Sequence, residues 1–148
     1  MKEKKEEQQI FFQKQKDRQD GCRIYAINNL MERVALNEDK FDKYCYEFDK
    51  LVACKGTREF FFIASDNNII TFILTKFDVA TTYYAPYSCK SVEDILDASN
   101  KFLVFSAEHI WCCRKHGGVW YYLDSMRKSP SKLNIKELSP KFGYIVVK

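Results

Sequence analysis

The sequence lacks long apolar runs and has no concentration of basic residues. Its longest apolar stretches, such as 60–64 and 102–106, are far shorter than the ~20 residues of a membrane-spanning helix. The N-terminus is charged and has no apolar core of the kind found in signal peptides. The net charge is +4, but lysines alternate with glutamates near the N-terminus and form no basic stripe. These absences argue against membrane association, secretion and nucleic-acid binding.

The sequence also lacks any Cys-x-x-Cys pair, although it contains six cysteines: Cys22, Cys45, Cys54, Cys89, Cys112 and Cys113. Without a secretory signal, reduced thiols are favoured over disulfides. A zinc site made of His109, Cys112, Cys113 and His116 is conceivable, but that spacing matches no standard structural pattern. Cys112 and Cys113 are adjacent, so in a strand they point to opposite faces of the sheet. We therefore predict no metal and no other cofactor.

Length and composition indicate one folded domain. The chain has 148 residues, of which 46% are hydrophobic and 16% aromatic, enough for one core. We expect residues 1–9 to be a charged tail or a frayed helix, and residues 10–148 to form a single, monomeric domain. The abundance of Lys, Asn, Ile, Phe and Tyr is typical of an AT-rich genome, such as that of a virus, a parasite or an intracellular bacterium. We expect a cytoplasmic protein, or one in the host cytoplasm or nucleus if it belongs to such a pathogen.

Apolar periodicity divides the chain into a helical first part and a strand-rich second part. Segments with the spacing or caps of helices are 22–34, 41–53, 65–77 and 91–99. Segments with the composition of strands are 79–84, 101–107, 109–115, 119–124 and 142–147. His116, Gly117 and Gly118 form a turn between two of these strands, which predicts a hairpin. The predicted fold class is α+β, with N-terminal helices packed on a C-terminal antiparallel sheet.

Cys22 lies where a turn becomes a helix. Asp20-Gly21 is a turn signal, and Ile24, Ile27 and Met31 follow at helical spacing. A cysteine just inside a helix start is close to unpaired N–H groups and to the positive end of the helix dipole, and both favour the thiolate. A cysteine in such a place is more often a half-buried core residue, so its role depends on what lies downstream.

A base for Cys22 has few candidates, because the sequence contains only two histidines. His116 lies in the predicted hairpin turn, whereas His109 begins an apolar strand. A tight hairpin places the start of its first strand beside the end of its second. Asp124, a lone acid at the end of an aromatic strand, is therefore expected next to His109.

These residues predict a Cys-His-Asp set in which the acid orients the base and the base holds the thiolate. An oxyanion hole would come from the backbone N–H of Cys22 and one side chain upstream, for which Gln15 and Gln19 are the candidates. Trp111 or Trp120 could shield the histidine and the acid from water, although both could simply be core aromatics.

Two stretches of the sequence resemble the signatures of the Josephin family. In the first, Cys22 is followed by Ala26 and Ile27 and then by Asn28-Asn29-Leu30. In the second, His109 is followed closely by a tryptophan, a basic strand and a Trp-Tyr pair before Leu123-Asp124-Ser125. The segments 10–15 and 143–148 are similar to the family's oxyanion-glutamine segment and its last strand. The region from about 36 to 100 resembles the family only in layout.

The resemblance implies a papain-like cysteine protease that removes ubiquitin, with ubiquitin or ubiquitinated proteins as partners. Carried over, Cys22 is the nucleophile, His109 the base, Asp124 the orienting residue and Gln15 the oxyanion donor, with Gln19 as the alternative. Asp124 stands where the family usually has Asn, and other papain-like peptidases use Asp there. Gln15 lies somewhat farther before Cys22 than in the family. The helical arm that guards the cleft would be the segment 36–58, which is short.

Substrate contacts follow from the same resemblance. Ubiquitin ends in an extended Arg-Gly-Gly tail, which calls for a narrow cleft with aromatic residues and for acids near its entrance. Trp111 and Glu108 are the predicted substrate-binding residues, although Glu108 could be an ordinary solvated glutamate. Two alternatives remain open: a papain-like peptidase with a different protein substrate, and a catalytically dead module that binds ubiquitin. The presence of Cys22, His109 and Asp124 together argues against a dead module.

Overall fold

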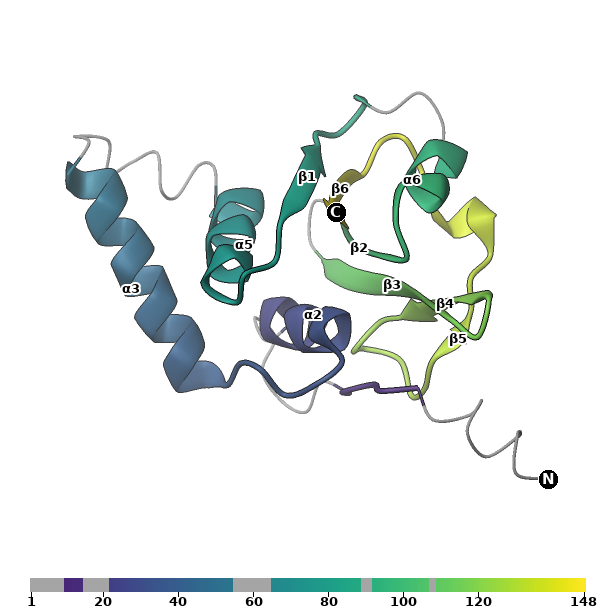
Figure 1. Cartoon of the computed structure of the whole chain (residues 1–148), viewed down its shortest axis with the longest axis horizontal. Helices are drawn as coiled ribbons and strands as arrows, with labels where there is room; N and C mark the ends of the chain where they lie inside the picture. The colour runs from purple at the N-terminus through teal and green to yellow at the C-terminus, as the bar shows by residue number, and fades with distance from the viewer. Residues whose placement is uncertain (1–9, 15–21, 55–64, 89–91, 107–108) are drawn as a thin grey trace.

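The structure is a computed structural model that describes residues 10–14, 22–54, 65–88, 92–106 and 109–148. Its centre is a six-stranded antiparallel sheet with the strand order β1-β6-β2-β3-β4-β5 (Figure 1). The strands are β1 (Thr81–Tyr84), β2 (Lys101–Phe105), β3 (Ile110–His116), β4 (Val119–Leu123), β5 (Ser131–Lys132) and β6 (Gly143–Val147). The chain is therefore α+β, and its sheet comes from the second half of the sequence, as predicted.

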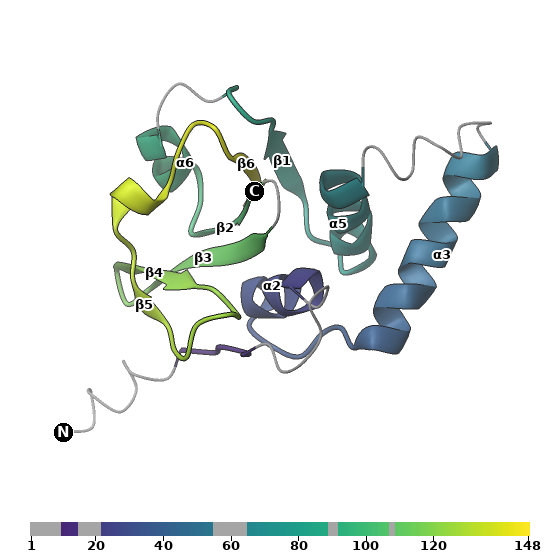
Figure 2. The same ribbon diagram turned by 180° about the vertical axis from the view of Figure 1, so that it is seen from behind.

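The helices of the described segments are α2 (Cys22–Met31), α3 (Glu38–Cys54), α5 (Ser65–Lys76) and α6 (Val92–Ala98), with a short 3-10 helix η2 (Ile135–Glu137). Helix α2 packs on β2 and β3, and α5 contacts both α2 and α3. Figures 1 and 2 show α3 outermost, with α5 between it and the sheet. Among the segments described, no helix combines the length and the apolar character needed to cross a lipid bilayer.

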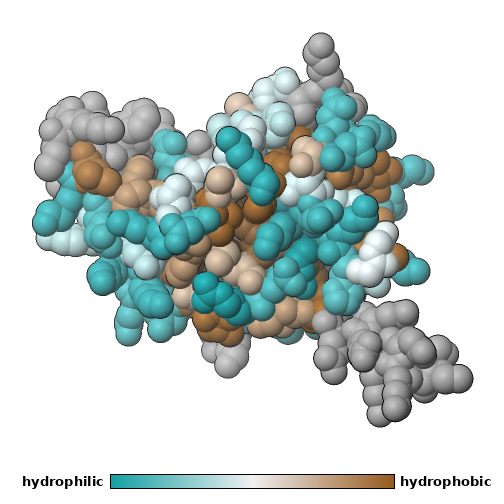
Figure 3. All heavy atoms as spheres, viewed as in Figure 1, coloured by the Kyte–Doolittle hydropathy of each residue, from teal (hydrophilic) through white to brown (hydrophobic). Residues whose placement is uncertain are grey.

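The sheet is buried on both faces. Consecutive residues of β2, β3 and β6 are buried, and successive strand residues point to opposite faces. One core contains α2, α5 and Phe41 of α3, packed with Leu103, Cys112 and Ile145 of the sheet. The second core lies on the opposite face, where Val92 and Ile95 of α6 meet Phe102, Trp111 and Tyr144. The expectation of helices on a sheet is confirmed, but the chain also covers the other face with α6. In the space-filling view, apolar atoms gather along the middle of the molecule with polar atoms on both sides (Figure 3).

Several element boundaries differ from those predicted. Helix α2 ends at Met31 rather than Val34, because Glu32 has a φ of +60° and leaves the helical conformation. Helix α3 begins at Glu38, where the exposed Asn37 side chain accepts a hydrogen bond from the Lys40 N–H at 2.8 Å. The sequence did not predict β5 or η2, because segments of two or three residues carry no periodicity.

A buried asparagine fixes the path from α2 to α3. The side-chain oxygen of Asn28 accepts hydrogen bonds from the Ala35 N–H at 2.9 Å and the Leu36 N–H at 2.8 Å. Its amide nitrogen donates to the Leu36 carbonyl at 3.0 Å and to the Gln13 side-chain oxygen at 2.6 Å. The side chain is fully buried, so these backbone groups have little access to water in its absence.

We expect Asn28→Ala to lower the free energy of unfolding by about 3 kcal/mol, because it leaves several buried backbone groups without partners. Asn37→Ala is the control: it removes an exposed helix cap and should lower the same quantity by only about 1 kcal/mol. Urea unfolding followed by circular dichroism measures both. Equal losses for the two variants would show that the Asn28 hydrogen bonds do not stabilise the fold beyond an ordinary cap.

Candidate active site

Cys22 is the first residue of α2 and is half-buried, so its thiol is packed but accessible. The other end of α2 is tied to the sheet by Arg114 of β3, which is 2% exposed. The Arg114 guanidinium donates one hydrogen bond to the Asn29 carbonyl oxygen and another, at 3.0 Å, to the Phe11 carbonyl oxygen. Its Nε also lies 3.7 Å from a Glu32 carboxylate oxygen. The end of α2 therefore has a defined position on β3.

The same strand positions the predicted base. His109 immediately precedes β3, at the opposite end of the strand from Arg114. The Cys22 side chain lies near enough to the imidazole to contribute to the raised pKa of His109. Helix α2 thus runs along β3 with its start beside His109 and its end beside Arg114. The structure brings together Cys22 and His109, which are far apart in the sequence.

Asp124 follows β4 directly, and the strand register explains its place. Cys112 of β3 pairs with Leu123 of β4, so Asp124 comes opposite Trp111 and diagonal to His109. His109 Nε2 lies 2.7 Å from Asp124 Oδ1. The same oxygen accepts a hydrogen bond from the Met126 N–H at 2.9 Å. The predicted proximity of His109 and Asp124 is therefore present, and the carboxylate oxygen is held by two donors.

The electrostatics of this pair favour charge on both partners. Hydrogen bonding to Asp124, and then to Cys22, raises the pKa of His109 to about 9, although burial opposes the shift. Burial raises the pKa of Asp124, but the hydrogen bonds from His109 and from the Met126 backbone outweigh it and the net shift is downward. At neutral pH the pair is imidazolium and carboxylate. Because Nε2 faces Asp124, Nδ1 is the ring nitrogen available to the Cys22 sulfur.

The two tryptophans have different surroundings. Trp111 is 5% exposed and stacks against His109, with ring centroids 5.6 Å apart and an interplanar angle of 25°. Trp120 packs on Phe102, with ring centroids 5.3 Å apart. Trp111 is thus the tryptophan that shields His109 from water. Its predicted contact with substrate stays a prediction.

The remaining predicted residues lie elsewhere or outside the described segments. Gln15, Gln19 and Glu108 belong to segments that the structure does not describe, so their predicted roles stay predictions. His116 ends β3 and its ring meets Tyr121 edge-on, with centroids 6.4 Å apart. Cys112 and Cys113 point into the two different cores, which places their sulfurs on opposite faces of the sheet.

The environments of the other described cysteines differ from that of Cys22. Cys112 and Cys113 are fully buried. Burial raises the pKa of Cys112 to about 12 and that of Cys113 well above its ordinary value. Burial also raises the pKa of the Cys45 thiol to about 11. Since the thiolate is the nucleophile, these thiols are poorly reactive at neutral pH.

Two contributors to the site, the Met126 N–H and Arg127, were not predicted from the sequence. Asp124 accepts from the N–H two residues on, an arrangement that Asp side chains commonly make in turns. Arg127 donates its backbone N–H to the Asp124 carbonyl at 2.9 Å, closing the turn. The turn-forming tendency of Asp-Ser was a usable signal for the first contact. The Arg127 side-chain contacts depend on tertiary structure and had no local signal.

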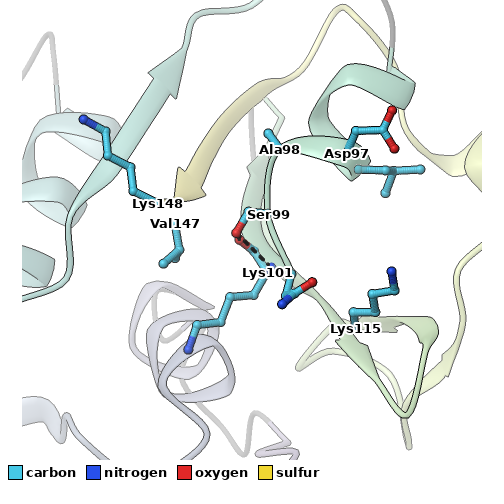
Figure 4. Close-up of a pocket in the computed structure, with 9 residues that line it drawn as sticks. Asp97, Ala98, Ser99, Lys101, Lys115, Val147 and Lys148 are labelled. Atoms are coloured by element: carbon cyan, nitrogen blue, oxygen red, sulfur yellow. Dashed lines mark hydrogen bonds between the residues drawn. The ribbon is translucent and has the colours of Figure 1, made fainter.

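The structure also contains a pocket of about 520 Å³ at the other end of the sheet. It lies between the end of α6 and the ends of β2, β3 and β6 (Figure 4). The side chains of Lys101, Lys115 and Lys148 extend from it in different directions rather than converging. Because Lys115 is near the end of β3 and His109 precedes its start, this pocket is separate from the site around Cys22.

We expect the His109 imidazole to keep its proton until the pH approaches about 9. Its raised pKa means that the cation is present throughout the neutral range and is lost only as the pH rises through that value. NMR titration of the ring carbon-bound protons measures this, and a His116→Gln variant assigns the two signals. In Asp124→Ala the midpoint should fall toward the ordinary value of about 6.5. A wild-type midpoint near 6.5 would contradict the hydrogen-bonded imidazolium.

Comparison with known families gives an assignment that does not depend on the geometry of the site. The sequence model of the Josephin family matches residues 17–143, a span that contains Cys22, His109 and Asp124. Comparison with curated protein sequences gave no match. The Josephin family consists of cysteine peptidases of the deubiquitinase type, and Josephin domains bind ubiquitin. With most of its length matched, the chain belongs to the Josephin family.

Proposed function

We propose that this protein is a deubiquitinase that hydrolyses ubiquitin isopeptide bonds with Cys22, His109 and Asp124. The observation that carries the proposal is the double engagement of His109, whose ring interacts with the Cys22 side chain and lies 2.7 Å from Asp124. We further propose that the helix bearing the cysteine and the strands bearing the histidine and the acid form a papain-like arrangement. Family membership supports both statements.

In the acylation step, the Cys22 thiolate attacks the carbonyl carbon of the isopeptide bond and a C–S bond forms. The His109 imidazolium gives its proton to the departing lysine amine as the C–N bond breaks. The products of this step are the free lysine side chain and a thioester between ubiquitin and Cys22. The raised pKa of His109 keeps this proton available at neutral pH.

In the deacylation step, His109 is neutral and takes a proton from water, whose oxygen attacks the thioester carbonyl. The C–S bond breaks, ubiquitin leaves with a free carboxyl group that loses its proton to the solvent, and the Cys22 thiolate and the His109 imidazolium are restored. The developing oxyanion is stabilised by the Cys22 backbone N–H at the start of α2 and by Gln15, or by Gln19 in its place. A nucleophile that depends on a free thiolate also suits a reducing compartment such as the cytoplasm.

The direct test of this function is turnover of ubiquitin bearing a fluorogenic amide at its C-terminus. Wild type should release the fluorophore, and Cys22→Ala should reduce release to the background rate because the nucleophile is gone. The control is Cys45→Ala, which should retain activity since burial raises the pKa of that thiol to about 11. Thermal unfolding of each variant checks that loss of activity is not loss of fold.

Two results would overturn the proposal. Cleavage of short peptides without turnover of ubiquitin would indicate a papain-like peptidase with another substrate. Binding of ubiquitin without turnover would indicate a ubiquitin-binding module that has lost its activity.

The identity of the third residue gives a second prediction. Asp124→Asn should keep activity within roughly tenfold, about 1.4 kcal/mol of barrier, because the amide oxygen can still accept from His109 and Met126. Asp124→Ala should lose on the order of a hundredfold, because His109 can then rotate away from Cys22. In Asp124→Asn the decline of activity at alkaline pH should begin below the pH of about 9 expected for wild type, because the carboxylate no longer holds the imidazolium proton. Steady-state rates measured against pH decide, and equal damage by Asn and Ala would show that the negative charge itself is required.

A further inference from the structure

We propose that Arg127 is a positioning residue that holds Asp124, and through it His109, in the geometry needed at the site. This inference rests on the proposed function for its consequence in catalysis, but not for its structural content. Arg127 touches neither Cys22 nor His109 in any contact of the described residues, so any effect on the reaction passes through Asp124 and the turn that contains it.

The backbone of Arg127 closes the turn that begins at Asp124. The Arg127 N–H donates to the Asp124 carbonyl at 2.9 Å, while the Met126 N–H donates to Asp124 Oδ1 at 2.9 Å. Both the main chain and the side chain of Asp124 are thereby bonded to the residues that follow it. The direction of the carboxylate toward His109 consequently depends on where the end of this turn is held.

The Arg127 side chain holds that end of the turn. Its guanidinium carbon lies 4.1 Å from the centroid of the Tyr122 ring, and Nη2 lies 3.0 Å from a Glu137 carboxylate oxygen. Tyr122 is buried in the sheet at 6% exposure. Glu137 belongs to η2, which is capped by the Asn134 side chain and followed by the buried Leu138. The guanidinium thus lies against a rigid ring on one side and a capped helical turn on the other.

The Tyr122 ring also connects Arg127 to the imidazole of His109, through Trp111. Tyr122 packs on Trp111 with ring centroids 5.6 Å apart and an angle of 30°, and Trp111 stacks on His109 in turn. The Tyr122 and Trp111 rings belong to the core on the α6 face of the sheet, and the Arg127 guanidinium lies over the Tyr122 ring. Arg127 is therefore connected to His109 in two ways, through the turn at Asp124 and through the rings of Tyr122 and Trp111.

Two roles for Arg127 predict opposite effects on the proton of His109. The titratable groups that face His109 are the Cys22 thiol from α2 and the Asp124 carboxylate after β4. Asp124 in turn interacts with Arg127 and Tyr122, and Glu137 pairs with Arg127. If Arg127 acts only as a nearby cation, its removal favours the imidazolium and the pKa of His109 rises. If it positions Asp124, its removal weakens the Asp124–His109 hydrogen bond and the pKa of His109 falls. The sign of the change therefore separates the two roles.

The experiment is an NMR titration of His109 in wild type, Arg127→Ala and Arg127→Lys, which needs no substrate. We expect the midpoint to fall by about 0.5 pH unit or more in Arg127→Ala, because the hydrogen bond to Asp124 is the largest cause of its elevation. Arg127→Lys keeps the charge but not the planar guanidinium, so it should also lower the midpoint, by less. Lys128→Ala, at an exposed neighbour, is the matched control and should leave it unchanged. An unchanged or higher midpoint in Arg127→Ala would overturn the proposal.

Kinetics on the fluorogenic ubiquitin substrate give the consequence for catalysis. Arg127→Ala should lower kcat several-fold with little change in KM, and Glu137→Gln should shift both the midpoint and kcat in the same direction by less. Equal loss of kcat in Arg127→Ala and Lys128→Ala would contradict the role. If wild type shows no turnover, the proposed function fails, while the titration still decides whether Arg127 positions Asp124.

Discussion

The arrangement of this molecule depends on the hydrogen bonds of one buried guanidinium. Arg114 is 2% exposed, and an unpaired charge at such a place is destabilising by about 3–5 kcal/mol when its partners are removed. Its partners are the Asn29 carbonyl in the last part of α2 and the Phe11 carbonyl in the N-terminal segment. Satisfying Arg114 therefore requires α2 and the segment before it to lie against β3. The constraint fixes the far end of the helix that begins with Cys22.

The site is a consequence of that constraint together with strand geometry. β3 carries Arg114 near one end and is preceded by His109 at the other, so a helix anchored at Asn29 has its first residue at the histidine. The hairpin to β4 then brings Asp124 to the end of β3 where His109 lies, because Cys112 pairs with Leu123. Cys22 meets His109 and Asp124, which lie much later in the sequence, because one strand is shared by a helix and a hairpin. The resulting imidazolium is stabilised mainly by hydrogen bonds, which outweigh the burial that opposes its charge.

The parts of this arrangement that the sequence predicted are those governed by local rules. The start of α2 at Cys22 followed from a turn signal and helical spacing, and the proximity of His109 and Asp124 followed from hairpin geometry, with Gly117 and Gly118 at positive φ in the turn. The covering of the second face by α6 was not predicted, because amphipathic patterns do not specify which face of a sheet a helix will cover. Arg114 is a charged residue on the same face of its strand as the apolar Ile110 and Cys112. Its partners could be identified only from tertiary structure. The same holds for Arg127, whose contacts with Tyr122 and Glu137 join three separate elements.

The proposed function requires that this framework present Cys22, among the cysteines, to the C-terminus of ubiquitin. It is tested most directly by reacting the protein with ubiquitin that carries a C-terminal electrophile and mapping the adduct by mass spectrometry after digestion. We expect one adduct per chain, on Cys22, with a rate that drops sharply in His109→Ala. An adduct on Cys45 or another cysteine, or labelling of Cys22 that is indifferent to His109, would contradict it.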